Sequence, residues 1–130
     1  MIAFHLDTRS GVSPYLQLVQ QVRHALRLGA LHEGDQLPTV KEVVGSLALN
    51  PNTVLKAYRE LEHQGLVAAR PGVGTFVTRT LSDASLEAHG ALRRELTVWL
   101  AHARRAGLDD ESIEALVRDA FRSGGLEVVA

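Results

Sequence analysis

The sequence predicts a mainly α-helical fold with one small β-hairpin. Apolar residues recur at helical spacing behind good helix-start residues, first in three segments and later in two more. Between these groups the periodicity changes to two short strand-like runs around Arg70-Pro71-Gly72-Val73-Gly74. The 130 residues suffice for one domain, or for a small domain with an appendage. The expected order is three helices, a hairpin and two further helices.

The first helix is expected to begin at Ser13-Pro14, because serine can cap a helix and proline suits the first helical position. Gly29 is expected to end it. The residues that keep to its apolar face are Tyr15, Leu18, Val19, Val22 and Leu26. Before this helix, the alternation of Ile2, Phe4 and Leu6 suggests a short strand; after it, residues 32–38 read as a loop.

The next two helices are short and close together. Thr39 and Glu42 have the spacing of a capping box, which starts one helix. Ala48-Leu49 is a tight break, after which Asn50 caps the following helix and Pro51 takes its first position. The core face of that helix is predicted to hold Val54, Ala57, Tyr58 and Leu61. Its opposite face is predicted to hold Asn52, Lys56, Arg59 and His63.

The hairpin is predicted from strands at residues 66–69 and 75–78, and residues 78–83 look like a linker. Two amphipathic helices follow, separated at Gly107, and Asp109 can cap the second. Gly124-Gly125 is expected to end that helix. The predicted domains are therefore residues 1–80 and 81–130.

Composition bounds the function. The chain has no cysteine and no apolar run near the ~20 residues of a membrane span, and its start lacks the pattern of a signal peptide, so we expect a cytoplasmic protein. Residues 1–80 carry eight Lys/Arg and six Asp/Glu (+2), and residues 81–130 carry six and nine (−3). The histidines lack metal-ligand spacing, and we find no nucleophile–base pairing or cofactor loop. We therefore expect no enzyme activity, no metal and no cofactor.

Two short helices with a tight break match a helix-turn-helix, and the hairpin makes it a winged helix. In this motif the start of the second helix enters the major groove of DNA. The Asn50-Pro51 start is expected to leave free backbone amides that attract phosphate. Asn52 and Lys56 can reach base edges, with Thr53 in the same first turn, and Arg59 is expected on a phosphate.

Residues 37–77, LPTVKEVVGSLALNPNTVLKAYRELEHQGLVAARPGVGTFV, resemble the winged-helix domain of the GntR family of bacterial transcription regulators. The matching elements are Leu37-Pro38-Thr39, the helix start Asn50–Val54, the exit Leu61…Gly65-Leu66-Val67 and the wing Gly72-x-Gly74-Thr75-Phe76-Val77. The run NPNTVLKAYREL and the short remainder ending in GLDDESIEALVRDAF are similar to the small YtrA-type branch.

This resemblance implies a homodimer that binds a roughly palindromic operator in double-stranded DNA. It further implies repression of an operon, commonly one that encodes membrane transport systems and often the regulator itself. The residues that match DNA-contacting positions of the family are Thr39 and Lys41 for the backbone, Asn52, Thr53 and Lys56 for the recognition helix, and Arg70, Gly72 and Gly74 for the wing.

Two positions depart from the family pattern. Ala48 stands where many relatives have glycine, at a cost on the order of 1 kcal/mol if its backbone is left-handed. Pro51 stands where most relatives outside this branch have arginine, so their operator preference does not transfer to this chain.

The segment after the linker is too short for a typical GntR effector domain, which needs a core of its own. Its two amphipathic helices are expected to become stable by packing against a second copy, with Trp99 as the anchor. The predicted dimerisation residues are Leu92, Leu96, Trp99, Leu100, Ile113, Leu116, Val117 and Phe121. A small-molecule effector is compatible with this arrangement, but no pocket is marked. An alternative is a winged helix that contacts proteins and has no operator.

Overall fold

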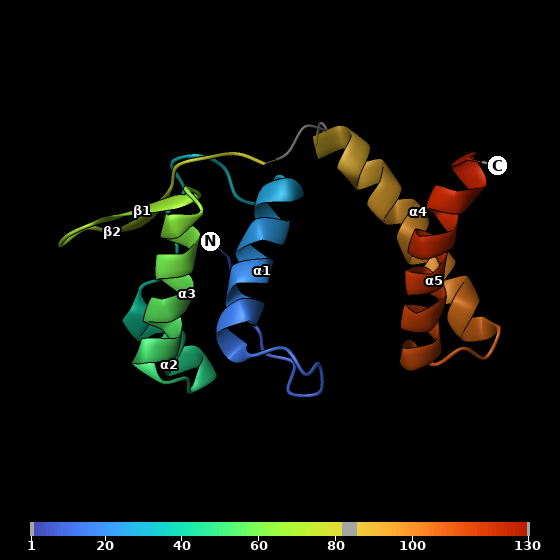
Figure 1. The fold of residues 1–130 in the computed structure, drawn as a ribbon, viewed down its shortest axis with the longest axis horizontal. Helices are drawn as coiled ribbons and strands as arrows, with labels where there is room; N and C mark the ends of the chain where they lie inside the picture. Colours follow the sequence, from blue (N-terminus) through green and yellow to red (C-terminus); the bar gives the residue numbers. More distant parts are fainter. Residues whose placement is uncertain (1, 82–85, 130) are drawn as a thin grey trace. The chain divides into compact units, whose positions relative to one another are not determined.

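The computed structural model describes residues 2–81 and 86–129, and the side chains of residues 2–81 and 88–123. Contacts divide the chain into two compact units, Met1–Leu86 and Glu87–Ala130. The elements of the first unit are α1 (Pro14–Arg27), α2 (Val40–Leu47), α3 (Pro51–His63), β1 (Val67–Arg70) and β2 (Gly74–Val77). The second is built from α4 (Leu86–Arg105) and α5 (Asp110–Val129). The predicted fold class, a winged helix followed by two helices, is confirmed (Figure 1).

The ends of α1 lie where the sequence predicts them. Ser13 is the N-cap residue and Pro14 takes the first position, although the Ser13 side chain makes no cap hydrogen bond. Gly29 has a φ of 75°, and its amide donates to the carbonyl oxygen of Leu26 at 3.3 Å. A left-handed glycine just after the last helical turn is a common helix stop, so the helix ends there.

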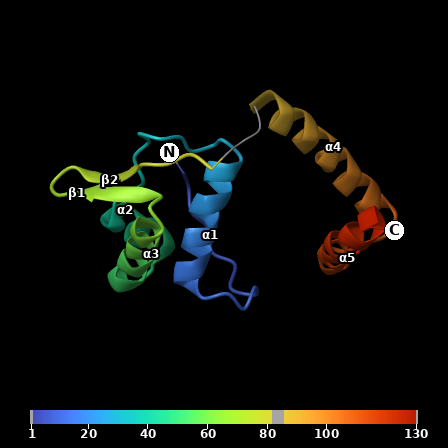
Figure 2. The same ribbon diagram turned by 45° about the horizontal axis from the view of Figure 1, so that its top comes forward.

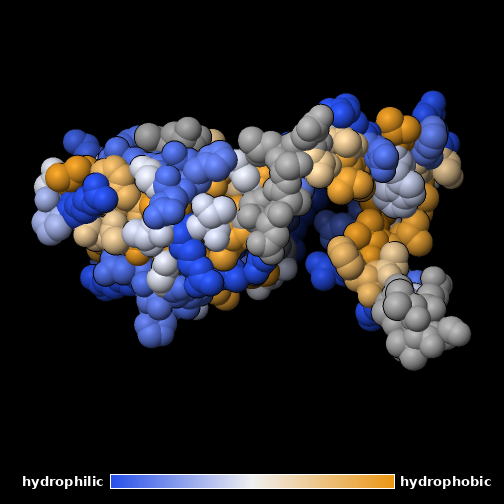
Figure 3. Space-filling model, turned by 90° about the horizontal axis from the view of Figure 1, so that it is seen from above, coloured by the Kyte–Doolittle hydropathy of each residue, from blue (hydrophilic) through white to orange (hydrophobic). Residues whose placement is uncertain are grey.

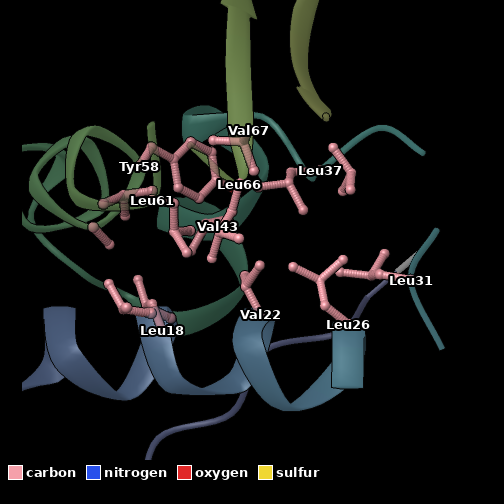
Figure 4. Close-up of a cluster of buried hydrophobic side chains, with 14 residues drawn as sticks. Leu18, Val22, Leu26, Leu31, Leu37, Val43, Tyr58, Leu61, Leu66 and Val67 are labelled. Atoms are coloured by element: carbon pink, nitrogen blue, oxygen red, sulfur yellow. The ribbon is translucent and has the colours of Figure 1, made fainter. Parts of the chain in front are cut away.

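The core of the first unit lies between α1, α3 and the hairpin (Figure 4). Side chains of Leu18, Val22 and Leu26 point from α1 toward those of Leu61 and Val43 (Figure 4). Figures 1 and 2 both show α1 beside α3 with their first turns at the same end. The predicted core face of α3 is confirmed: Val54, Ala57, Tyr58 and Leu61 are between 0% and 7% exposed. Burying such side chains is the main force that fixes α3 on this unit.

Each strand of the hairpin differs from its predicted range by one residue: β1 lies one residue later in the sequence and β2 one residue earlier. In the pairing, Val67 lies opposite Val77 and Arg70 opposite Gly74. The segment predicted as a loop before α2 also pairs with β2. The amide of Leu37 donates to the carbonyl oxygen of Thr75, and that of Gly34 to Val77, each at 2.8 Å. Because these bonds link residues distant in sequence, the base of the hairpin is held to the body of the unit.

The N-terminal segment does not form the short strand that its alternation suggests. Gln17 and Gln21 of α1 hold it instead, since their amides pair with the backbone as another strand would. The side chain of Gln21 bonds the N–H and the carbonyl of His5, and that of Gln17 bonds those of Asp7. Gln17 is buried, and its side chain also donates to the carbonyl oxygen of Val12 at 2.8 Å.

The second unit is a pair of helices around a small contact. Asp109 caps α5 as predicted, because its carboxylate accepts the Ser112 N–H at 2.8 Å. The predicted end of the helix at Gly124-Gly125 is wrong, since α5 continues to Val129. Glycine weakens a helix by about 1 kcal/mol but can adopt its backbone angles, and no proline follows to stop it. The predicted linker includes residues 82–85, which lie outside the described residues, so the domain boundary after residue 80 stays a prediction.

Candidate nucleic-acid interface

The start of α3 is fixed by its own residues. Asn50 has an extended backbone, and its side-chain oxygen accepts the N–H of Asn52 at 2.8 Å. Pro51 has no N–H, and the amide of Thr53 donates to the carbonyl oxygen of Asn50 at 3.0 Å. The prediction that this start leaves free amides for phosphate is therefore wrong for Asn52 and Thr53. The helix dipole remains, because it arises from the aligned peptides of the whole helix.

The outer face of α3 is polar and accessible. Asn52, Lys56, Arg59 and His63 are all exposed, as predicted, while Thr53 is half-buried. Thr53 is therefore less free to project outward than the sequence pattern suggests. Asn52 and Lys56 are one turn apart, so both can reach the same neighbouring surface.

A contact that the sequence does not reveal involves Lys56 on this face. The Nζ atom of Lys56 lies 4.0 Å from the centroid of the Tyr15 ring, on α1. The sequence pattern places Tyr15 only on the apolar face of its own helix. No local signal links the two residues, since the contact arises from the packing of α1 beside α3.

The helix α2 and its turn set the position of α3. The capping box is confirmed: the N–H of Glu42 donates to Thr39 Oγ1 at 3.1 Å, and the N–H of Thr39 donates to Glu42 Oε1 at 3.3 Å. Ala48 has φ 53° and ψ 38°, so the turn uses a left-handed alanine. Thr39 and Lys41 are both exposed at the start of α2.

Tyr58 ties α3 to the entrance of α2. Its hydroxyl donates to the carbonyl oxygen of Pro38, next to the N-cap residue of α2. Burial, with a smaller contribution from the Glu42 carboxylate, raises the pKa of Tyr58 well above its ordinary value of 10.0. The hydroxyl therefore stays protonated and keeps donating near neutral pH.

The wing carries one cation and two glycines. Arg70 is exposed, and its guanidinium carbon lies 4.5 Å from the centroid of the Phe76 ring. Gly72 has a φ of 74° and Gly74 a φ of 144°, which side chains disfavour. A Cβ at Gly74 would also come within 2.5 Å of Gln36 Nε2. The shape of the turn thus explains both glycines without DNA, whereas it does not require the exposed arginine.

Five of the eight predicted dimerisation residues are exposed, and the second unit has an accessible apolar surface (Figure 3). Leu92 is 61% exposed, Leu96 53% and Phe121 80%. Leu116 and Trp99 are also exposed, Leu100 and Val117 are half-buried, and Ile113 is buried. Among the described side chains of this unit, only Ala103 and Ile113 are buried. An apolar groove of about 450 Å³ between the helices is lined by Leu96, Trp99, Leu116, Val117, Ala120 and Phe121.

Residues 14–77 match the family described as "Bacterial regulatory proteins, gntR family". The HTH-type transcriptional repressor YtrA of Bacillus subtilis is 31% identical over 115 residues, which are 88% of each chain. The chain belongs to the gntR family. It is thus a DNA-binding transcription regulator with the winged helix of that family, and its likeness to YtrA extends beyond the winged helix.

Two solved structures have a fold similar to that of this chain. A transcriptional antiterminator from Listeria monocytogenes is 30% identical with a TM-score of 0.58, over 91% of this chain and 89% of the other. The AraR DNA-binding domain, solved in complex with operator ORE1, has a TM-score of 0.50 at 24% identity, over 60% of this chain and 95% of that chain. The second likeness is in the fold alone.

Metal-ligand clusters and membrane-spanning helices are absent from the part of the chain that the structure describes. No group of three or more histidine, cysteine, aspartate or glutamate side chains could hold a metal ion there. Within the same residues, no helix is long and apolar enough to cross a membrane.

Proposed function

We propose that this gntR-family regulator is a homodimeric repressor that acts in the cytoplasm on a palindromic operator. The observation that carries the proposal is the outer face of α3. It is exposed, polar and cationic, and its opposite face is buried in a core that α2 and the hairpin share. A helix held in this way can enter the major groove without rearranging the fold.

The proposal assigns a role in DNA binding to each predicted residue of the first unit. Asn52 and Lys56 read base edges, with Thr53 beside them, and Asn50 fixes the start of the helix. Arg59 binds a phosphate, and Thr39 and Lys41 at the start of α2 contact the backbone. Arg70 in the wing, whose turn depends on Gly72 and Gly74, reaches the minor groove.

The small core of the second unit supports the homodimer. Only two side chains are buried in the described part of this unit, so the unit buries little apolar surface. A helix pair with so little buried apolar surface is only weakly stable in water by itself. Large exposed apolar patches are typical of protein interfaces. A second copy presents the same surface, so α4 and α5 of both copies can cover it in one helical bundle. Trp99, with the other apolar residues of the groove, would be central to that interface.

Selection from a pool of random double-stranded DNA tests the operator. The wild-type protein should enrich an inverted repeat, and its affinity should fall with salt, because phosphate contacts release counterions. Lys56→Ala should weaken binding to the enriched duplex by about 5- to 150-fold, corresponding to ~1–3 kcal/mol. Arg27→Ala is the matched control, since it removes an exposed cation at the far end of α1. Failure to enrich any duplex would favour the protein-interaction alternative.

Sedimentation equilibrium tests the homodimer. Leu96→Glu places a charge in the apolar surface and should shift the protein toward monomer. Ala101→Glu is the control, because Ala101 is exposed on the opposite face of α4. A wild-type protein that remains a monomer at micromolar concentration would refute this part of the proposal.

The regulated operon is proposed from the likeness to YtrA-type regulators. Deleting the gene for this protein should raise transcription of its own operon, and of transporter genes if these neighbour it. Unchanged or lower transcript levels would argue against repression.

A further inference from the structure

The Lys56 side chain of α3 rests on an aromatic ring from another helix. Its Nζ atom lies 4.0 Å from the centroid of the Tyr15 ring, which is within the range of a cation–π contact. Lys56 is exposed, whereas Tyr15 is half-buried and packs against the core. The ring is therefore the fixed partner, and the lysine is the side chain whose freedom the contact limits.

Apart from its packing against the core, the Tyr15 ring has Lys56 as its one polar partner among the described residues. No described residue forms a hydrogen bond with the Tyr15 hydroxyl. Every buried side-chain polar atom of the described residues has a partner, so this unpartnered hydroxyl is accessible to water. Arg59, on the same outer face of α3, has no aromatic or ionic partner among the described residues. The ring thus holds one of the two cations of the face and leaves the other free.

Holding a lysine matters for binding because a free lysine samples many rotamers. Contact with DNA selects a few of them, and the lost freedom weakens binding. A ring that already restricts the ammonium lowers that loss before DNA arrives. Lys56 lies on the second turn of α3, so the held ammonium is near the end of the helix that the proposed function directs into the major groove.

We propose that Tyr15 is a positioning residue for DNA readout, which holds Lys56 in place for its contact with the duplex. This inference rests on the proposed function. Loss of the ring should weaken binding by about two- to fivefold, the range expected for an exposed cation–π contact. Tyr15 itself need not touch DNA.

A double-mutant cycle separates positioning from simple packing. The probe is the inverted-repeat duplex that the wild-type protein enriches from the random pool. Tyr15→Leu keeps an apolar side chain but removes the ring, and Tyr15→Phe keeps the ring. We expect Tyr15→Leu to weaken binding when Lys56 is present and to have no effect in the Lys56→Ala background. Tyr15→Phe should bind like the wild type.

Arg59→Ala provides the matched cycle, because Arg59 does not contact the ring. Tyr15→Leu and Arg59→Ala should act additively. Equal losses from Tyr15→Leu with and without Lys56 would show a structural role only and overturn the proposal. Tighter binding by Tyr15→Leu would overturn it as well, since the ring would then restrain Lys56 away from DNA.

A measurement without DNA distinguishes this inference from the proposed function. In NMR spectra of the 130-residue chain without DNA, the Lys56 side-chain methylene protons should be shifted by the ring current of Tyr15. The shift should persist in Tyr15→Phe and vanish in Tyr15→Leu. An absent shift in the wild type overturns the positioning even if DNA binds. A wild-type protein that shows the shift but binds no duplex overturns the proposed function, and with it the DNA role of Tyr15.

Discussion

Replacing Ala48 with glycine should stabilise the first unit. Ala48 is the only non-glycine residue of positive φ among those described, and it lies in the left-handed region. A Cβ there costs about 1–2 kcal/mol, of which the greater freedom of glycine in the unfolded chain offsets about 0.4–1 kcal/mol. Ala48 is exposed, so its methyl group has no core contact to lose. The expected net gain is about 0.5–1 kcal/mol, or ~2–8 °C in Tm for a domain of this size.

Native-state hydrogen exchange of the α3 amides in the full chain measures this gain, because the slowest of them report on unfolding of the first unit. Ala69→Gly is the control, since Ala69 is an exposed residue of β1, where glycine weakens the strand. Protection should rise in Ala48→Gly and fall in Ala69→Gly. A fall in both variants would refute the argument that the turn between α2 and α3 is strained.

Three further predictions concern caps and titrating groups. Thr39→Ala should lower the stability of the first unit by about 1 kcal/mol in urea denaturation, and an unchanged midpoint would show that the capping box is not needed. Burial raises the pKa of Tyr58, so the stabilisation from its neutral hydroxyl should be complete below pH 10. Above that pH the free energy of unfolding should fall by at most ~1.4 kcal/mol per pH unit. Urea midpoints in alkaline buffer should show this fall in the wild type and not in Tyr58→Phe. The Ser112 N–H holds the pKa of Asp109 below its ordinary 3.8, so the cap should stabilise α5 above that pH and weaken as pH falls; circular dichroism of the wild type and of Asp109→Ala should converge in acid, and a constant difference would contradict this.

Local signals predicted much of the fold and of the candidate site. Capping geometry depends on residues within one turn, so Thr39, Asn50 and Asp109 could be assigned to helix starts from sequence alone. Helical periodicity likewise separated the buried face of α3 from the face with Lys56 and Arg59. These predictions hold because each depends on neighbours a few positions away.

Contacts between distant residues could not be predicted in the same way. The Tyr15–Lys56 contact, the approach of Gln36 to Gly74 and the pairing of residues 34–37 with β2 all depend on how elements pack. The extent of α5 differs from the prediction for another reason, because two consecutive glycines predict a helix end although they only weaken a helix. The hydrogen bonds of the Asn52 and Thr53 N–H groups also differ from the prediction of free amides. Asn50 accepts the first with its side-chain oxygen and the second with its carbonyl oxygen.

The glutamine side chains that hold the N-terminal segment have a consequence for synthesis. A ribosome releases residues 5–12 before Gln17 and Gln21, so this part of the nascent chain has no partner until α1 has emerged and formed. The backbone of residues 5–12 can therefore take up its folded position only after α1 has formed. A purification tag fused before residue 1 would lengthen the segment that precedes α1, whereas a tag fused after residue 130 would leave its length unchanged.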